Sequence, residues 1–288
     1  ARKQLILDLS RDEVCEAVIK MITDVLKSAP ISYVKWDMNR NMTEIGSTAW
    51  PAKKQKEIAH RYMLGLYKIL ENITSNFPNI LFESCSGGGG RFDGGMLYYM
   101  PQTWTSDDTD AIERLMIQEG TSLVYPTSSM GSHVSAVPNH QVHRITPLNT
   151  RGVVAMAGSF GYELDVTKMN EEEKEEVKKQ VEFYKNIRST VQFGDLYRLK
   201  SSFDSNEAAW MNLSKDGKEV VVSYVKKYAE ANVIPRRLKV KALDENSLYE
   251  VIETGEVFGG DELMYIGLEI GELMGDYQAK NWTLRKVD

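Results

Sequence analysis

The chain has 288 residues, of which 42% are hydrophobic and 26% are charged. This composition suits one large folded domain, or a barrel-sized domain followed by a smaller one. The formal net charge is −6, and lysine and arginine are dispersed, which argues against nucleic acid or an anionic membrane as a partner. The two cysteines have dissimilar surroundings and indicate no disulfide framework, so together with the lack of a signal-peptide pattern we expect a cytoplasmic protein.

The first two thirds of the chain alternate between strand-like and helix-like patterns. We expect strands at residues 5–9, 31–37, 80–85, 103–106, 123–125 and 152–157. Between them, apolar residues at helical spacing predict helices at about residues 12–27, 53–76, 111–118 and 170–187. Strands that alternate with helices are parallel, so the pattern indicates an α/β domain, which we place at residues 1–198.

The pattern changes after about Leu199. Short alternating runs replace the helical spacing, at residues 208–213, 219–224, 237–241, 248–252 and 278–284. Turn-forming residues separate them, for example in Lys215–Lys218. This pattern predicts a small antiparallel β-sandwich domain at residues 199–288.

The expected strand at residues 31–37 ends in charged residues. Side chains two positions apart share a face of a strand, so Lys35 and Asp37 project together while Trp36 points the other way. A cation beside a carboxylate keeps it ionised, as a nucleophile requires. The alternative is a plain structural ion pair at the end of a strand.

Further polar residues follow the later strands: Cys85, the run Gly87–Gly90 and the acidic pair Asp107–Asp108. Active sites of (β/α) barrels lie at the carboxyl ends of the strands, where these residues are expected. Acidic residues on different strands, near Trp36 and Trp104, indicate sugar chemistry. An aromatic ring can hold the apolar face of a pyranose, and a pair of carboxylates can break a glycosidic bond.

Other interpretations of these residues are weaker. The glycine run lacks the Lys-Ser/Thr continuation of a phosphate-binding loop. Asp107–Asp110 could bind a divalent metal ion, but acidic residues also suit the start of a helix. Cys85 has no evident base near it in sequence, so packing or a polar contact is the simpler role. Three histidines form no recognisable ligand set, and we expect neither a metal ion nor a cofactor: His133, His140 and His143.

Three long motifs occur in order along the chain: Tyr33–Arg40 (YVKWDMNR), Glu83–Asp93 (ESCSGGGGRFD) and Trp104–Asp110 (WTSDDTD). A fourth block runs from Val124 to His140. In these motifs the chain resembles the retaining α-galactosidases of glycoside hydrolase family 36, and the resemblance extends over essentially the whole chain. It implies a (β/α)8 TIM-type barrel followed by a small antiparallel β-sandwich.

The resemblance also implies roles for individual residues. Asp37 would be the nucleophile, and Asp107 the acid/base, with Asp108 as the less favoured member of the adjacent pair. Lys35 would hold sugar hydroxyls and keep Asp37 ionised, and Cys85 would lie against the galactose. The remaining residues expected to bind substrate are Gly88, Arg2, Trp36 and Asn39.

The implied activity is hydrolysis of terminal α-linked galactose in sugars such as melibiose and raffinose. The alternatives are a transgalactosidase of the raffinose-synthase type, and an inactive fragment. Members of the family are longer at the N-terminus, and Leu5–Leu9 would correspond to about the third barrel strand. We therefore expect about six of the eight barrel strands, and either a homo-oligomer or association with the missing N-terminal portion.

Overall fold

The computed structural model describes residues 4–232 and 234–287. They form two compact units, of which the first ends at Trp104 and the second begins at Thr105. Among the described residues, no helix is both long and apolar enough to cross a membrane.

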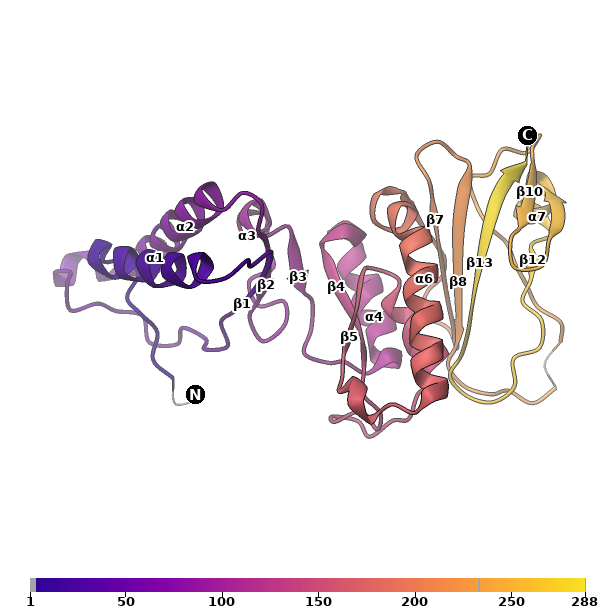
Figure 1. The fold of residues 1–288 in the computed structure, drawn as a ribbon, viewed down its shortest axis with the longest axis horizontal. Coiled ribbons are helices and arrows are strands. Elements are labelled where there is room, and N and C mark those ends of the chain that lie inside the picture. Colours follow the sequence, from indigo (N-terminus) through magenta and orange to yellow (C-terminus); the bar gives the residue numbers. More distant parts are fainter. Residues whose placement is uncertain (1–3, 233, 288) are drawn as a thin grey trace. The chain divides into compact units, whose positions relative to one another are not determined.

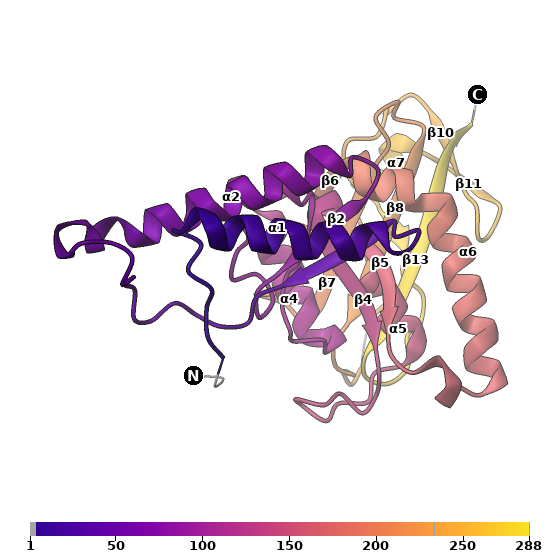
Figure 2. The ribbon, with the colours of Figure 1, turned by 60° about the vertical axis from the view of Figure 1, so that its left-hand side comes forward.

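The first unit combines short parallel strands with helices (Figure 1). Strands β1 (Tyr33–Asp37), β2 (Leu81–Cys85) and β3 (Gln102–Trp104) are parallel neighbours in that order. Helices α1 (Asp12–Lys27) and α2 (Ile58–Asn76) lie side by side (Figure 2). A 3-10 turn, η1 (Ala52–Glu57), leads into α2, and the short helix α3 (Gly94–Tyr99) precedes β3.

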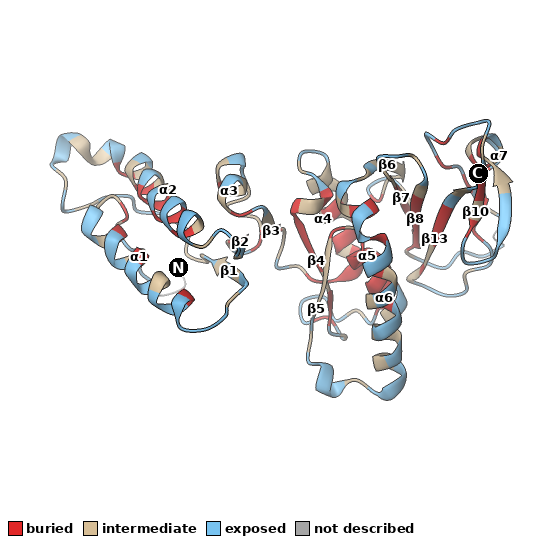
Figure 3. Ribbon diagram, turned by 45° about the horizontal axis from the view of Figure 1, so that its top comes forward, coloured by how far each residue is buried: buried red, intermediate tan, exposed pale blue. Residues whose placement is uncertain are grey.

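Helix α2 supplies much of the core of this unit. Its residues Ile69 and Ile73 are fully buried, and they belong to one apolar cluster with Phe82 of β2 and Met96 of α3. Figure 3 shows the buried residues of α2 along one side of the helix. Burial of each such side chain stabilises the fold by about 1.5–3 kcal/mol.

The strand expected at Leu5–Leu9 is wrong. These residues carry no strand hydrogen bonds, and Leu5 and Leu7 are 99% and 57% exposed. A parallel strand forms only where a neighbouring strand satisfies its backbone, and apolar composition alone does not provide one. Leu9 is nevertheless buried, and its carbonyl accepts a hydrogen bond from the thiol of Cys15, 3.2 Å away.

The second unit begins with a pair of parallel strands. Strands β4 (Met130–Ser135) and β5 (Ser159–Glu163) are parallel and fully in register. The helices of this part are α4 (Ala111–Ser122), α5 (Leu148–Ala155) and α6 (Glu171–Phe193), and two 3-10 turns complete it, η2 (Thr127–Ser129) and η3 (Val166–Lys168).

Two further strand predictions are wrong. Leu123–Tyr125 is a turn in which Leu123 and Val124 are 66% and 76% exposed, and the strand lies further on, at Met130–Ser135. Residues 152–155 belong to helix α5, and the run is apolar because this part of the helix is buried. A short apolar run fits a buried helix as well as a buried strand, so its spacing could not decide.

The C-terminal part is antiparallel, as predicted. A six-stranded sheet contains β6 (Asp195–Lys200), β7 (Glu207–Leu213), β8 (Glu219–Lys226), β10 (Leu248–Val251), β11 (Glu256–Gly259) and β13 (Gln278–Val287). The two short strands β9 (Arg237–Leu238) and β12 (Leu268–Glu269) pair with each other, and α7 (Gly260–Tyr265) lies between β11 and β12 in the chain.

The six-stranded sheet is covered on both faces, which explains why β8 is buried along almost its whole length. Val220, Val222 and Tyr224 belong to the cluster with β9, β12 and α7. The alternate residue Val225 packs with α4 and α5, and Val221 packs with α6. The sheet therefore fixes α4, and with it the segment that precedes α4 in the chain.

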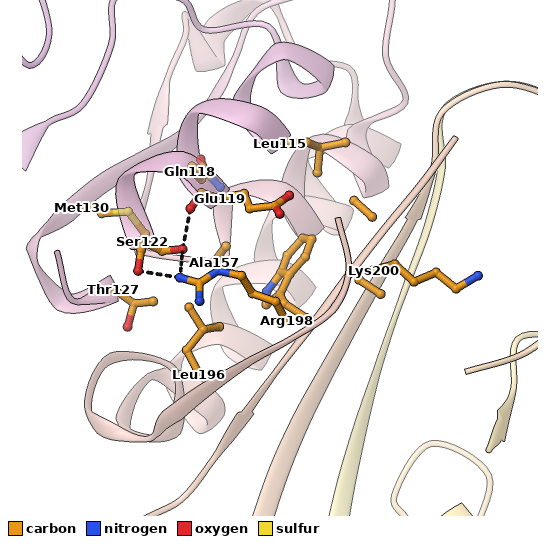
Figure 4. A pocket seen from close by; sticks show the side chains of 13 residues that line it. Leu115, Gln118, Glu119, Ser122, Thr127, Met130, Ala157, Leu196, Arg198 and Lys200 are labelled. Carbon is orange, nitrogen blue, oxygen red and sulfur yellow. Dashed lines mark hydrogen bonds between the residues drawn. The ribbon is translucent and has the colours of Figure 1, made fainter. Parts of the chain in front are cut away.

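A cavity of about 40 Å³ lies between α4 and the strands β6 and β7 (Figure 4). The guanidinium of Arg198 reaches across it, and its Nη2 atom donates to the carbonyl oxygen and the Oγ atom of Ser122, at 2.5 and 2.6 Å. The volume suffices for a water molecule but not for a pyranose ring. This cavity is therefore not a candidate site for a sugar.

Candidate active site

Lys35 and Asp37 lie on the same face of β1, as the spacing predicted. The register of the sheet sets Lys35 opposite Glu83 and Asp37 opposite Cys85 on β2. The Lys35 Nζ atom is 3.8 Å from Glu83 Oε1 and 4.7 Å from the centre of the Trp104 ring. The ion-pair partner of Lys35 is thus Glu83, whereas the sequence had suggested Asp37.

Glu83 is a buried carboxylate that the sequence analysis missed. It is 1% exposed, and it accepts hydrogen bonds from the Tyr33 hydroxyl and from Gln102 Nε2, the latter at 3.1 Å. A signal was present, because an acidic residue in the middle of an apolar strand needs partners to be buried. The register that supplies Lys35 as one of them could not be read without the fold.

Asp37 is exposed, and two neighbouring side chains donate hydrogen bonds to its carboxylate. Asn39 Nδ2 donates to Asp37 Oδ2, and Asn39 Oδ1 accepts from the backbone N–H of Gly87 at 2.7 Å. The thiol of Cys85 is hydrogen-bonded to Asp37 and to the Gly88 N–H. Burial, reinforced by the Asp37 carboxylate, raises the pKa of Cys85 to about 11. The thiol is therefore neutral near pH 7 and acts as a donor to Asp37.

The glycine run after β2 forms a tight turn. Gly87 and Gly88 have φ angles of +57° and +82°, which side chains other than glycine rarely adopt. The turn is closed by hydrogen bonds from Ser86 N to the Gly88 carbonyl (2.8 Å) and from Gly90 N to the Ser86 carbonyl (3.3 Å). A Cβ atom on Gly90 would lie 2.6 Å from that second carbonyl oxygen. The turn thus requires glycine to bring its backbone beside Cys85.

Arg91 joins the ends of the two strands. Its Nη2 atom donates to the carbonyl oxygens of Cys85 (3.0 Å) and Trp36 (3.3 Å). Burial lowers the pKa of Arg91, while the nearby Asp37 carboxylate opposes that effect. Arg91 was not predicted as a site residue, and it ties the backbone just before Asp37 to the end of β2.

Of the other predicted residues, Trp36 lies apart from this cluster. Its side chain is on the opposite face of β1, packed against the apolar cluster of α1 and α2. Asn39, in contrast, bonds directly to Asp37. Arg2 lies outside the described residues.

In the second unit, the residues Thr105–Asp110 connect β3 to α4 without regular structure. We call them the acid/base segment, after the role expected of Asp107 from the family resemblance. Asp107 is exposed. Asp108 is held in a turn, because its N–H donates to Ser106 Oγ (3.1 Å) and its Oδ1 atom accepts from Asp110 N (3.0 Å). Asp110 caps α4 by accepting from the N–H groups of Ile112 and Glu113, both at 3.1 Å. Of the adjacent acidic pair, Asp107 is the one presented outward.

Arg114 supports this segment from α4. It is 2% exposed, and its guanidinium donates to the carbonyl oxygens of Ser106 (3.2 Å) and Gly131 (2.7 Å). Burial lowers the pKa of Arg114 to about 10, although the carboxylates of Asp108 and Glu163 oppose it. The side chain therefore stays charged at neutral pH and ties the segment to β4.

The histidines do not gather. His133 Nδ1 lies 3.9 Å from Glu163 Oε2 on β5, His140 is exposed, and His143 has a φ angle of +57°. Within residues 4–232 and 234–287, no group of three or more His, Cys, Asp or Glu side chains is arranged to hold a metal ion.

Short parallel strands that alternate with helices, with polar side chains gathered on and just after the strands, define an α/β protein of the (β/α)-barrel class. The chain belongs to the Melibiase family, which matches residues 1–194, and residues 207–284 match the glycosyl hydrolase family 36 C-terminal domain. Both the family resemblance and the fold class inferred from the sequence are confirmed.

Related proteins are known from bacteria and fungi. The chain is 61% identical over 286 residues to the α-galactosidase AgaA of Geobacillus stearothermophilus, covering 99% of this chain and 39% of AgaA. It is 51% identical to the α-galactosidase Mel36A of Lactobacillus acidophilus, covering 100% of this chain and 39% of that protein. The chain thus spans about two fifths of the length of these relatives.

Solved structures of α-galactosidases are also similar to this chain. The crystal structure of AgaA superposes with a TM-score of 0.97 at 61% identity, covering 100% of this chain and 40% of that one. The A355E D548N variant of AgaA, crystallised with raffinose, gives the same TM-score at 60% identity, with the same coverage. A Geobacillus thermoleovorans α-amylase, at 13% identity and a TM-score of 0.60, shares the fold alone.

Proposed function

We propose that the protein is a retaining α-galactosidase that removes terminal α-linked galactose from oligosaccharides such as melibiose and raffinose. The observation that carries this proposal is the 61% identity to AgaA over 99% of the chain. A variant of that relative was crystallised with raffinose. The arrangement of donors around Asp37 supports the same function.

In the first step, a carboxylate oxygen of Asp37 attacks the anomeric carbon of galactose. The bond from that carbon to the glycosidic oxygen breaks, and Asp107 gives its proton to the departing oxygen. In the second step, Asp107 takes a proton from water, and the water oxygen displaces Asp37. Two inversions at the same carbon release galactose with its original α configuration, and both carboxyl groups return to their starting state.

The contacts of Asp37 favour nucleophilic attack. Asn39 and the Cys85 thiol donate to its carboxylate, which orients it and stabilises its charge. Lys35 and Arg91 add positive charge on the same strand ends. Because the pKa of Cys85 is about 11, the thiol is a poor nucleophile near pH 7, which favours Asp37 over Cys85 as the attacking group.

The experiment is hydrolysis of p-nitrophenyl α-galactoside by the protein as its gene encodes it. We expect turnover in the wild type and a loss of at least about 10³-fold in Asp37→Asn. Asp204→Asn, which alters an exposed carboxylate, is the matched control. Activity that survives Asp37→Asn, or no activity in the wild type, contradicts the proposal.

Two measurements of the reaction products test the retaining mechanism and the choice between hydrolysis and transfer. NMR of the first galactose released should show the α anomer, and the β anomer would exclude the double displacement. Adding an acceptor sugar in excess tests the transgalactosidase alternative, for which transfer products would exceed free galactose.

We also propose that the catalytic domain spans residues 1–198 and the C-terminal β domain residues 199–288. The ends of the two family matches, at residues 194 and 207, support a division in this region. Strand β6 (Asp195–Lys200) already belongs to the antiparallel sheet, which favours a boundary just before it. A homo-oligomer, or association with the N-terminal portion that the family resemblance implies, remains a prediction. Light scattering on the purified protein measures the oligomeric state.

A further inference from the structure

The acid/base segment has no secondary structure of its own, so other parts of the molecule must hold it in place. The loop after β4 supplies such contacts, and we call its residues Asn139–Arg144 the Asn139 loop. We propose that Asn139 and Arg144 are positioning residues that hold the segment so that Asp107 can protonate the leaving group. This inference rests on the proposed function, in which Asp107 is the acid/base.

The first anchor is the ion pair between Arg144 and Asp110. Arg144 Nη1 donates to Asp110 Oδ2, and Arg144 Nη2 lies 3.7 Å from Glu113 Oε1. The Asp110 side chain is 2% exposed and that of Arg144 is 18% exposed, so water screens the pair little. The Arg144 guanidinium also lies 5.5 Å from the centre of the Tyr277 ring, which limits its freedom to move away.

The second anchor is the contact between Asn139 and Thr109. Asn139 Nδ2 donates to Thr109 Oγ1 at 3.1 Å, and Ser135 Oγ donates to the Thr109 carbonyl at 2.7 Å. Asn139 and Thr109 are 2% and 9% exposed. Thr109 and Asp110 are the second and third residues after Asp107, so these contacts fix the backbone close to the reacting carboxyl group.

Asn139 also shapes the loop that presents Arg144. Its Oδ1 atom accepts from the N–H groups of Gln141 (2.8 Å) and Val142 (3.0 Å). Its own N–H donates to the Arg144 carbonyl at 2.9 Å, which closes the loop. One side chain therefore organises the loop and contacts the segment at the same time.

Helix capping alone does not require Arg144. The Asp110 carboxylate already caps α4 through the N–H groups of Ile112 and Glu113. Arg144 adds a charged contact from a different loop, and that contact restricts where Asp110 can lie. A role in placing Asp107, rather than in starting the helix, accounts for this extra interaction.

The chemistry gives a test that separates placement from stability. Protonation matters when the leaving group is a sugar alkoxide and matters little when it is dinitrophenolate, which leaves without a proton. A misplaced Asp107 should therefore slow cleavage of raffinose far more than cleavage of 2,4-dinitrophenyl α-galactoside. Simple loss of folded protein would lower both rates equally.

The test compares kcat/KM for these two substrates, in the protein as its gene encodes it. Arg144→Gln removes the charged anchor, and Thr109→Val removes the hydroxyl with little change of shape. We expect kcat/KM for raffinose to fall about 10–100-fold in each, and that for the dinitrophenyl substrate to stay within about threefold. Arg144→Lys, which keeps the charge but not the forked geometry, should restore part of the raffinose activity.

Matched controls come from the same unit of the chain. Arg237→Gln removes a half-exposed ion pair with Glu269, and Thr121→Val removes a hydroxyl that bonds within α4. Neither should change the ratio of the two substrates. Thermal unfolding shows whether each variant is folded, and Thr109→Val carries the test if Arg144→Gln does not fold.

The possible failures can be told apart. Equal losses on both substrates, or no loss on either, overturn the positioning role. If Asp107→Ala itself shows no preference for the better leaving group, the proposed acid/base role has failed instead. Hydrogen exchange provides a readout that needs no activity: amides of residues 105–112 should exchange faster in Arg144→Gln than in Arg237→Gln, and unchanged exchange contradicts the anchoring.

Discussion

The two candidate carboxylates are held in different ways. Asp37 ends a strand, and its neighbours are set by the register of β1 and β2 and by the turn that follows β2. Asp107 lies in a segment without regular structure, and contacts from Arg114, Asn139 and Arg144 hold the residues around it. A strand places its side chains by its own geometry, whereas a loop depends on side chains from distant parts of the sequence.

The largest effect that tests this comparison is expected within the acidic pair. Asp107→Asn should lower kcat/KM for raffinose by about 10²–10⁴-fold, because it removes the proposed acid/base. Asp108→Asn keeps an oxygen that can accept from Asp110 N, so a loss of about fivefold, or about 1 kcal/mol, is expected. Steady-state kinetics of the two variants decide between them. If Asp108→Asn is the more damaging, the two roles must be exchanged.

The next largest effect is expected at Glu83, on the strand β2 that pairs with the strand of Asp37. Glu83→Gln removes the buried charge beside Lys35 and should lower kcat/KM about 10–100-fold, because Lys35 loses its fixed position. The free energy of unfolding should fall by about 1–3 kcal/mol, because the buried amide cannot replace every contact of the carboxylate.

Glu16→Gln is the matched control for this variant. It alters an exposed carboxylate that pairs with Lys68, so neither rate nor stability should change measurably. Kinetics together with urea unfolding give both quantities. A Glu83→Gln protein with wild-type kinetics would show that Lys35 needs no partner on β2.

The surroundings of Asp37 on β1 were also more predictable from the sequence than those of Asp107. The two-residue period placed Lys35 and Asp37 on one face of β1, and the helix at residues 12–27 matches α1 to the residue. In the C-terminal part, alternation marked β7 and β8 because turns separate them clearly.

What could not be predicted depends on contacts between distant residues. The pairing of Lys35 with Glu83 requires the register of two strands that are far apart in sequence. The Asn139 loop carries no motif that links it to Thr109 or Asp110. The strands expected at residues 123–125 and 152–157 failed because local apolar runs do not reveal which residues find a paired neighbour.

A pH effect of intermediate size should come from Cys85. Its pKa of about 11 in the folded protein is above the ordinary value of 9.0. The unfolded chain therefore loses its thiol proton first, so this contribution to stability is complete below pH 9 and is lost as pH rises towards 11. The expected change is about 2 kcal/mol.

Urea unfolding between pH 8 and pH 11 measures this loss. In Cys85→Ser the decline in stability over that range should be shallower by about the same amount, because the hydroxyl does not ionise there. Burial also raises the pKa of Cys15, whose thiol bonds to the Leu9 carbonyl, so Cys15→Ser shows how much of such a change comes from burial alone, without a neighbouring Asp37. Identical pH profiles for wild type and Cys85→Ser would remove the thiol from the explanation of how Asp37 is held.

The smallest effect tests whether the turn after β2 needs glycine. Gly88→Ala places a Cβ atom at a φ angle of +82°, which should cost about 1–2 kcal/mol of unfolding free energy. Gly94→Ala is the matched control, because a Cβ atom there meets nothing within 4 Å and the residue begins α3. Alanine favours a helix over glycine, so that variant should be neutral or slightly more stable. Urea unfolding measures the stability of both variants. Equal stabilities would mean that the turn tolerates a side chain, and that the backbone conformation at Gly88 contributes little to the position of the residues around Asp37.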